Sequence, residues 1–171
     1  PLSLDDFTVA FEDDFLSNNL NKWTSYSVSG SQQWGTVGFG NPAPSAKMSG
    51  FSGGARNNED WLITKAIDLT GFDASTAAYF TFDSVKRYDG NDLEVLYATD
   101  YDGGNPTIDG TWTALSPALD NNTSSWDSWT NSGLLSLNNV GGAAVYVAFK
   151  YTSDTQSAAT FEIDNVKLLV E

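Results

Sequence analysis

The sequence is a succession of short strand-like runs separated by clusters of Gly, Asn, Asp and Ser, and signals for helices are nearly absent. Residues 77–84 and 144–151 alternate between apolar and polar side chains, which is typical of antiparallel strands with one buried and one wet face. About ten to twelve strands at this spacing predict an all-β fold, either a sandwich or a barrel. We expect strands at 9–15, 23–27, 33–37, 46–49, 60–63, 66–69, 77–84, 93–99, 112–115, 133–136, 144–151 and 160–169.

The chain has 171 residues and no interdomain linker, which predicts a single domain over residues 1–171. Its net charge of −14 disfavours nucleic acid as a partner, because the phosphate backbone would be repelled. The chain has no Cys and no His, which excludes disulfides, thiolate zinc sites and catalytic triads with His. Calcium, which prefers oxygen ligands, is the natural ion for this composition.

No run of residues approaches the roughly 20 apolar side chains of a membrane span, so no membrane insertion is expected. The first residues do not resemble a signal peptide. We expect the chain to be part of a longer precursor, secreted or attached to the cell surface, with other domains of that parent protein as neighbours.

The C-terminal run 161–170 changes its alternation once. Phe161 and Ile163 are in one phase, whereas Val166 and the apolar residues after it are in the other. Because strand side chains alternate with period 2, this slip predicts a β-bulge at Asp164-Asn165.

Carboxylates and amides concentrate near this bulge, in the first strand and at residues 58–60. If the first and last strands are neighbours, several carboxylates meet and repel one another unless a cation lies between them. They either share a calcium ion or form a solvated acidic edge. The candidate metal ligands are Glu12, Asp14, Asn58, Asp60 and Asp164.

Six Trp are more than a sandwich of this size needs for its core. Exposed aromatic faces stack on sugar rings, so some of these Trp either bind a glycan or pack on edge strands. The basic run near residue 86 and one Arg in the Gly-rich loop are candidate contacts to an anionic ligand, or ordinary solvated charges. The candidate ligand-binding residues are Trp112, Trp126, Trp129, Lys86, Arg87, Tyr88, Asn91 and Arg56.

The run Glu162-Ile-Asp164 superficially resembles the Glu-x-Asp-x-Glu signature of jelly-roll endoglucanases. The second Glu of that signature is missing, because Val166 and Lys167 occupy its positions. Catalysis by the paired carboxylates of a glycoside hydrolase is therefore not expected.

An ordered set of short motifs extends over nearly the whole chain: Phe11-Glu12, Trp23, Ser49–Phe51, Glu59–Thr64, Ile67–Leu69, Leu93–Val95, Thr99–Tyr101, Val145–Tyr151 and Ile163–Val166. This set resembles the choice-of-anchor J domains of secreted Bacteroidota proteins, relatives of the cleaved-adhesin domains of gingipains. Lys65 departs from the family, which has Pro after Leu-Ile-Thr.

This resemblance implies a calcium-stabilised, non-catalytic antiparallel β-sandwich of jelly-roll type, in which Glu12, Asp60 and Asp164 match the cation ligands. The leading hypothesis is a carbohydrate-binding module that binds a polysaccharide or surface glycan. The alternatives are an adhesion or structural domain without a sugar site and, less favoured, a polysaccharide-degrading enzyme.

Overall fold

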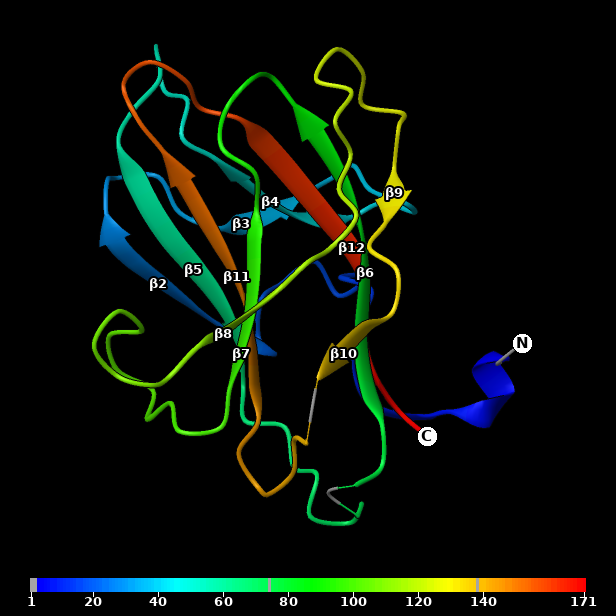
Figure 1. Cartoon of the computed structure of the whole chain (residues 1–171). Helices are drawn as coiled ribbons and strands as arrows, with labels where there is room; N and C mark the ends of the chain where they lie inside the picture. Colours follow the sequence, from blue (N-terminus) through cyan, green and yellow to red (C-terminus); the bar gives the residue numbers. More distant parts are fainter. Residues whose placement is uncertain (1–2, 74, 138) are drawn as a thin grey trace.

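The computed structural model describes residues 3–73, 75–137 and 139–171. Two antiparallel sheets face each other and enclose the core (Figure 1). The predicted all-β jelly-roll sandwich is therefore confirmed. In the part of the chain that the structure describes, no helix is long and apolar enough to cross a membrane.

The larger sheet has the strand order β10-β6-β12-β4-β3, with β1 paired to β12 and β9 paired to β6. The smaller sheet has the order β2-β5-β11-β7-β8. A short 3-10 helix, η1 (Leu4–Asp6), precedes the first strand. The strands are β1 (Thr8–Asp13), β2 (Trp23–Ser29), β3 (Gly35–Val37), β4 (Ser45–Ser49), β5 (Asn58–Thr64), β6 (Ala78–Arg87), β7 (Glu94–Ala98), β8 (Thr113–Leu115), β9 (Thr130–Asn131), β10 (Leu135–Leu137), β11 (Tyr146–Ser153) and β12 (Thr160–Val170).

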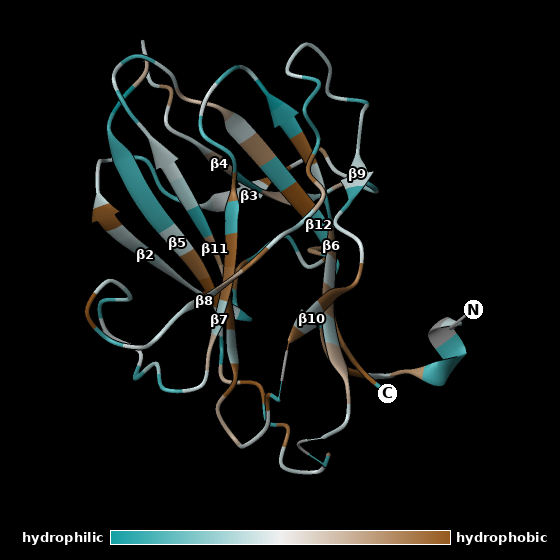
Figure 2. Cartoon of the chain, in the orientation of Figure 1, coloured by the Kyte–Doolittle hydropathy of each residue, from teal (hydrophilic) through white to brown (hydrophobic). Residues whose placement is uncertain are grey.

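An aromatic cluster fills the space between the sheets, and Phe149 of β11 lies at its centre. The Phe149 ring centroid is 4.9 Å from that of Phe82 and 5.8 Å from those of Phe80 and Trp23. These rings come from both sheets, so their burial holds the layers together. The banding of apolar and polar residues along β6 and β12 in Figure 2 is the alternation read from the sequence.

The predicted bulge lies in β12, where the register with β6 shifts between Asp164 and Lys167. Asn165 has a left-handed backbone with φ 49°. Before the bulge β12 pairs with β4, and after it β12 pairs with β1. The extra residue keeps the apolar side chains of both halves directed into the core, since Ile163 and Val166 are both fully buried.

Two strand assignments differ from the sequence prediction. Residues 66–69 form a single bridge between Ile67 and Val145 instead of a strand, because Asp68 turns the chain by accepting bonds from the Thr70 N–H and hydroxyl. The two-residue strand β9 was not predicted, because Thr130 and Asn131 show no hydrophobic alternation. It is a strand only through its pairing with β6.

Asp60 of β5 is an ionisable side chain on the core-facing side of the smaller sheet, between its register partners Ser27 and Tyr151. It is 1% exposed, and neither carboxylate oxygen has a hydrogen-bond partner among the described residues. Burial raises the pKa of Asp60 to about 6, and the Glu59 carboxylate adds to this rise. The nearby Ser27 hydroxyl opposes the rise, although in this geometry it donates to the Ser29 and Gly30 carbonyls and not to Asp60.

Replacing Asp60 by Asn should stabilise the protein at pH 7. The folded-state pKa lies above the ordinary value of 3.8, so the penalty of the buried charge is absent below this value, grows as the pH rises toward 6, and is complete above 6. We expect D60N to raise the free energy of unfolding at pH 7 by about 1 kcal/mol and to reduce its change between pH 5 and 7. Denaturant unfolding at both pH values measures this.

The charge-matched control is D5N, which changes an exposed carboxylate in η1. It should leave both values within about 0.5 kcal/mol of the parent protein. A loss of stability in D60N at pH 7 would contradict the unpartnered state of Asp60.

Candidate binding groove on the seven-stranded sheet

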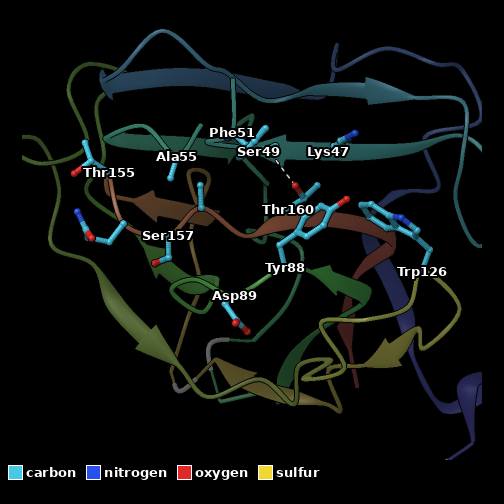
Figure 3. A pocket seen from close by; sticks show the side chains of 12 residues that line it. Lys47, Ser49, Phe51, Ala55, Tyr88, Asp89, Trp126, Thr155, Ser157 and Thr160 are labelled. Carbon is cyan, nitrogen blue, oxygen red and sulfur yellow. Dashed lines mark hydrogen bonds between the residues drawn. The ribbon is translucent and has the colours of Figure 1, made fainter. Parts of the chain in front are cut away.

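The outer face of the larger sheet carries the candidate site, and its floor comes from β4 and β12. Lys47 is the register partner of Glu162, and Ser49 is the register partner of Thr160. These four side chains alternate with Ala46, Met48 and the buried apolar residues of β12, so they point away from the core. The Thr160 hydroxyl donates to that of Ser49 at 2.7 Å (Figure 3).

Loops at the strand ends border this floor and form two hollows with volumes of about 690 Å³ and 450 Å³. Both hollows are lined by Lys47 and Trp126, so they adjoin along these two residues. We call the combined feature the sheet groove. The rest of its lining is Ser49, Phe51, Ala55, Tyr88, Asp89, Thr155, Gln156, Ser157, Ala158 and Thr160 in the larger hollow, and Phe39, Gly40, Ala43, Asp127, Trp129 and Glu162 in the smaller.

Aromatic side chains are displayed along this groove. Tyr88 and Trp126 are 53% and 37% exposed, and their rings meet edge to face at 6.4 Å above the β12 ribbon in Figure 3. Phe39 and Phe51 are exposed, one in each hollow. Most large apolar side chains of a soluble domain are at least partly buried, so their concentration here indicates a binding surface.

The turn after β6 presents Tyr88 through a strained backbone. Its φ is 67°, in the left-handed region that non-Gly residues seldom adopt. The Tyr88 N–H donates to the Thr123 carbonyl at 3.1 Å, and the Arg87 guanidinium donates to the same carbonyl and lies 4.8 Å from the Tyr88 ring. Strain of this kind persists where surrounding contacts enforce it, and it is concentrated at functional positions.

The loop that carries Trp126 is attached to β6 by Asp120. This carboxylate is buried and accepts bonds from the Lys86 N–H at 3.0 Å, the Asn122 N–H at 2.9 Å and the Ser128 hydroxyl at 2.8 Å. The loop is therefore fixed at both sides of Trp126, which holds the ring over the groove.

Two opposite charges lie on the floor beside Trp126. The Lys47 ammonium is 5.9 Å from the Trp126 ring centroid. Burial raises the pKa of Glu162, the Lys47 charge opposes this rise, and Asp164 adds to it. Among the described residues, nothing donates a hydrogen bond to the Glu162 carboxylate or forms a salt bridge with it.

Of the predicted ligand-binding residues, Trp126, Trp129 and Tyr88 line the sheet groove. Trp112 does not. Its ring lies 5.2 Å from Trp61 on the outer face of the smaller sheet, and its indole N–H donates to the Pro106 carbonyl at 3.0 Å. Trp112 therefore packs in a second apolar cluster, apart from the sheet groove.

The predicted basic contacts are engaged elsewhere. Lys86 is buried over Phe161 and forms a salt bridge to Asp92 at 2.9 Å. The Arg87 guanidinium donates to the Thr123 carbonyl, and Arg87 lines neither hollow. Arg56 donates to the Ser52 carbonyl and Asn91 to the Thr152 hydroxyl, and these two side chains also lie outside the lining.

Sequence reasoning missed the floor and both ends of the groove. Lys47 and Glu162 occupy the polar positions of alternating strands, a pattern shared by every wet sheet face. Phe39 and Phe51 each follow a Gly in a Gly-rich loop. An aromatic residue in such a loop could have indicated an exposed binding residue.

The five predicted metal ligands do not form one site. Asn58 and Asp60 lie on β5 in the smaller sheet, whereas Glu12, Asp14 and Asp164 lie at the β1–β12 end of the larger sheet. Among the described residues, no three acidic, His or Cys side chains converge on a possible metal position. The structure thus divides the five predicted ligands between the two sheets, and calcium binding stays a prediction.

At the bulge, Asp164 is fully buried and its carboxylate accepts the N–H groups of Asn41 at 2.7 Å and Asn165 at 2.8 Å. Burial raises the pKa of Asp164 to about 6, these two N–H groups oppose the rise, and the Asp83 and Asp14 carboxylates add to it. Glu12 and Asp14 line an adjacent hollow of about 250 Å³.

Neither a protein-family model nor a curated protein sequence matches the chain. Solved structures do match it over nearly its whole length. The K3 cleaved adhesin domain of Lys-gingipain from Porphyromonas gingivalis is 13% identical with a TM-score of 0.61, and the match covers 95% of this chain and 98% of that one.

Two carbohydrate-binding modules are also similar. The xylan-binding CBM22-1 domain of Paenibacillus barcinonensis Xyn10C is 10% identical with a TM-score of 0.56, over 96% of this chain and 95% of that one. The family 11 module of Clostridium thermocellum, solved with a β-1,3-1,4-mixed-linked tetrasaccharide, is 19% identical with a TM-score of 0.53, over 94% and 96%. At these identities the similarity establishes the fold: the chain has the jelly roll of cleaved adhesin domains and carbohydrate-binding modules.

Proposed function

We propose that this domain is a non-catalytic carbohydrate-binding module that binds a polysaccharide or surface glycan in the sheet groove. The observation that carries the proposal is the exposed pair Tyr88 and Trp126 above the polar floor of β4 and β12. Aromatic faces bind the apolar faces of sugar rings, and the hydroxyls, lysine and carboxylate of the floor can bond sugar hydroxyls.

The fold supports this proposal, because similar structures include modules solved with or named for β-glycans. We place the domain outside the cell, secreted or attached to its surface as part of a larger protein. This placement is supported by the fold it shares with a cleaved adhesin domain. The chain lacks the second Glu of the Glu-x-Asp-x-Glu signature, and for this reason we propose that the domain is not a glycoside hydrolase.

Replacing Trp126 by Ala should abolish most glycan binding and preserve the fold, because its ring is a stacking platform outside the core. We expect the affinity to fall at least about tenfold. Affinity electrophoresis on a panel of plant and marine polysaccharides identifies a ligand, and isothermal titration then compares the variant with the parent protein.

The matched control is W112A, which removes the same side chain from the cluster on the smaller sheet. It should lower the melting temperature and leave the affinity unchanged. If W126A instead costs stability and no polysaccharide of the panel binds the parent protein, the domain is a structural or adhesion module without a sugar site.

We propose separately that a structural calcium ion binds at the β1–β12 end, with Asp14, Asp164 and Glu12 as ligands. Support comes from the Asp83 and Asp14 carboxylates, whose negative charges near the buried Asp164 a cation would offset. The fit is partial: Asp164 already accepts two backbone N–H groups, and Lys22 and Lys167 line the hollow beside Glu12 and Asp14. Binding would therefore draw these carboxylates closer together.

Calcium should raise the melting temperature by roughly 5–10 °C at a hundredfold excess over its dissociation constant. D14N should remove most of this increase, while its side-chain oxygen can still accept the Leu16 N–H. Differential scanning calorimetry with calcium and with chelator measures both effects, and D5N is the control. An unchanged melting temperature in chelator would exclude a structural calcium ion.

A further inference from the structure

Glu162 is the most buried charged group of the sheet groove. It is 4% exposed and lines the smaller hollow next to Trp126. No described residue donates a hydrogen bond to its carboxylate. Its oxygens are not among the enclosed side-chain atoms that lack a partner, so they are open to the hollow, where the hydroxyl groups of a ligand can donate to them.

Acidic side chains outnumber basic ones along the groove. Asp89, Asp127 and Glu162 line it, and Lys47 is the one basic residue in the described lining. Lys47 is also the register partner of Glu162, so the one positive charge of the lining lies next to a negative one. Since the whole chain carries a net charge of −14, an anionic group that enters the groove meets repulsion at short and long range.

The cations that could have reversed this balance are held away from the groove. Lys86 is paired with the exposed Asp92, and the Arg87 guanidinium donates to the Thr123 carbonyl. Arg56 is bonded within its own loop. A uronate or sulfate on the ligand would therefore find no free arginine among the described groove residues.

We propose that the sheet groove selects neutral polysaccharides against anionic ones, and that Glu162 determines this selection by accepting hydrogen bonds from the hydroxyls of a sugar stacked on Trp126. Lys47 donates to an oxygen of the same sugar from the other side of the floor. This inference rests on the proposed function, because it specifies the ligand class of the same groove.

The test uses pairs of polysaccharides that share a backbone and differ in charge, such as hydroxyethyl cellulose with carboxymethyl cellulose, and fully methyl-esterified homogalacturonan with polygalacturonate. Affinity electrophoresis and isothermal titration at low salt should show binding to a neutral member at least tenfold tighter than to its anionic partner. The ratio should shrink at higher salt, because ions screen the repulsion.

The E162Q variant keeps the shape of the side chain and removes its charge. We expect the affinity for the neutral member to fall roughly tenfold, since hydrogen bonds to a charged acceptor are lost, and the ratio of neutral to anionic affinity to decrease. The control is E171Q, which removes an exposed charge at the C-terminus and should leave both affinities unchanged. The melting temperature of E162Q establishes that it is folded, and D89N provides a second variant that should also decrease the ratio.

Three results would overturn the inference, and they are distinguishable. If anionic polysaccharides bind as tightly as their neutral partners and W126A still abolishes binding, the groove does not select neutral polysaccharides. The proposed function would then remain intact. Unchanged affinities in E162Q would reject the role of Glu162. Failure of every member of every pair to bind would overturn the proposed function, and this inference with it.

Discussion

The bulge at Asp164-Asn165 is the constraint on which the larger sheet depends. It lies in β12, which pairs with β6 along both halves and changes its other neighbour from β4 to β1 at this point. Without the extra residue, the apolar side chains of one half would face solvent, because a shift of one residue exchanges the faces of a strand. The buried Asp164 carboxylate adds a second function, since it binds the N–H of Asn41 and so fixes the loop between β3 and β4.

The groove follows from this arrangement. In the half of β12 before the bulge, Thr160 and Glu162 face outward beside the side chains of β4 and form a rigid floor. The loops that end at this half of the sheet supply the aromatic walls, among them Trp126 and Tyr88. Rigid strands that position polar groups, with loops that display exposed side chains, are the common arrangement of binding sites. On the outer face of the smaller sheet the aromatic residues pack on one another. Trp61 of β5 contacts Trp112 of the loop between β7 and β8.

The two aspartates with strongly raised pKa values have opposite surroundings. Asp60 faces the core of the sandwich and its carboxylate oxygens lack partners among the described residues, whereas Asp164 faces outward under a loop and is bonded to two N–H groups. Burial is the largest cause of the rise in both. The sequence grouped them as ligands of one cation, because acidic residues near strand ends look alike until strand pairing assigns each of them to a sheet and a face.

The sequence by itself determined the fold class, most of the strands and the bulge, because alternation and turn residues are local properties of the chain. It also singled out Tyr88, Trp126 and Trp129 as candidate binding residues, all of which line the groove. The tertiary structure alone decided which Trp share a surface, which basic residues are free and that Glu162 and Lys47 meet beneath Trp126. These features depend on contacts between residues far apart in the chain, such as the pairing of β4 with β12. No local pattern encodes such a pairing, so the candidate site becomes visible only once the strands of the larger sheet are placed side by side.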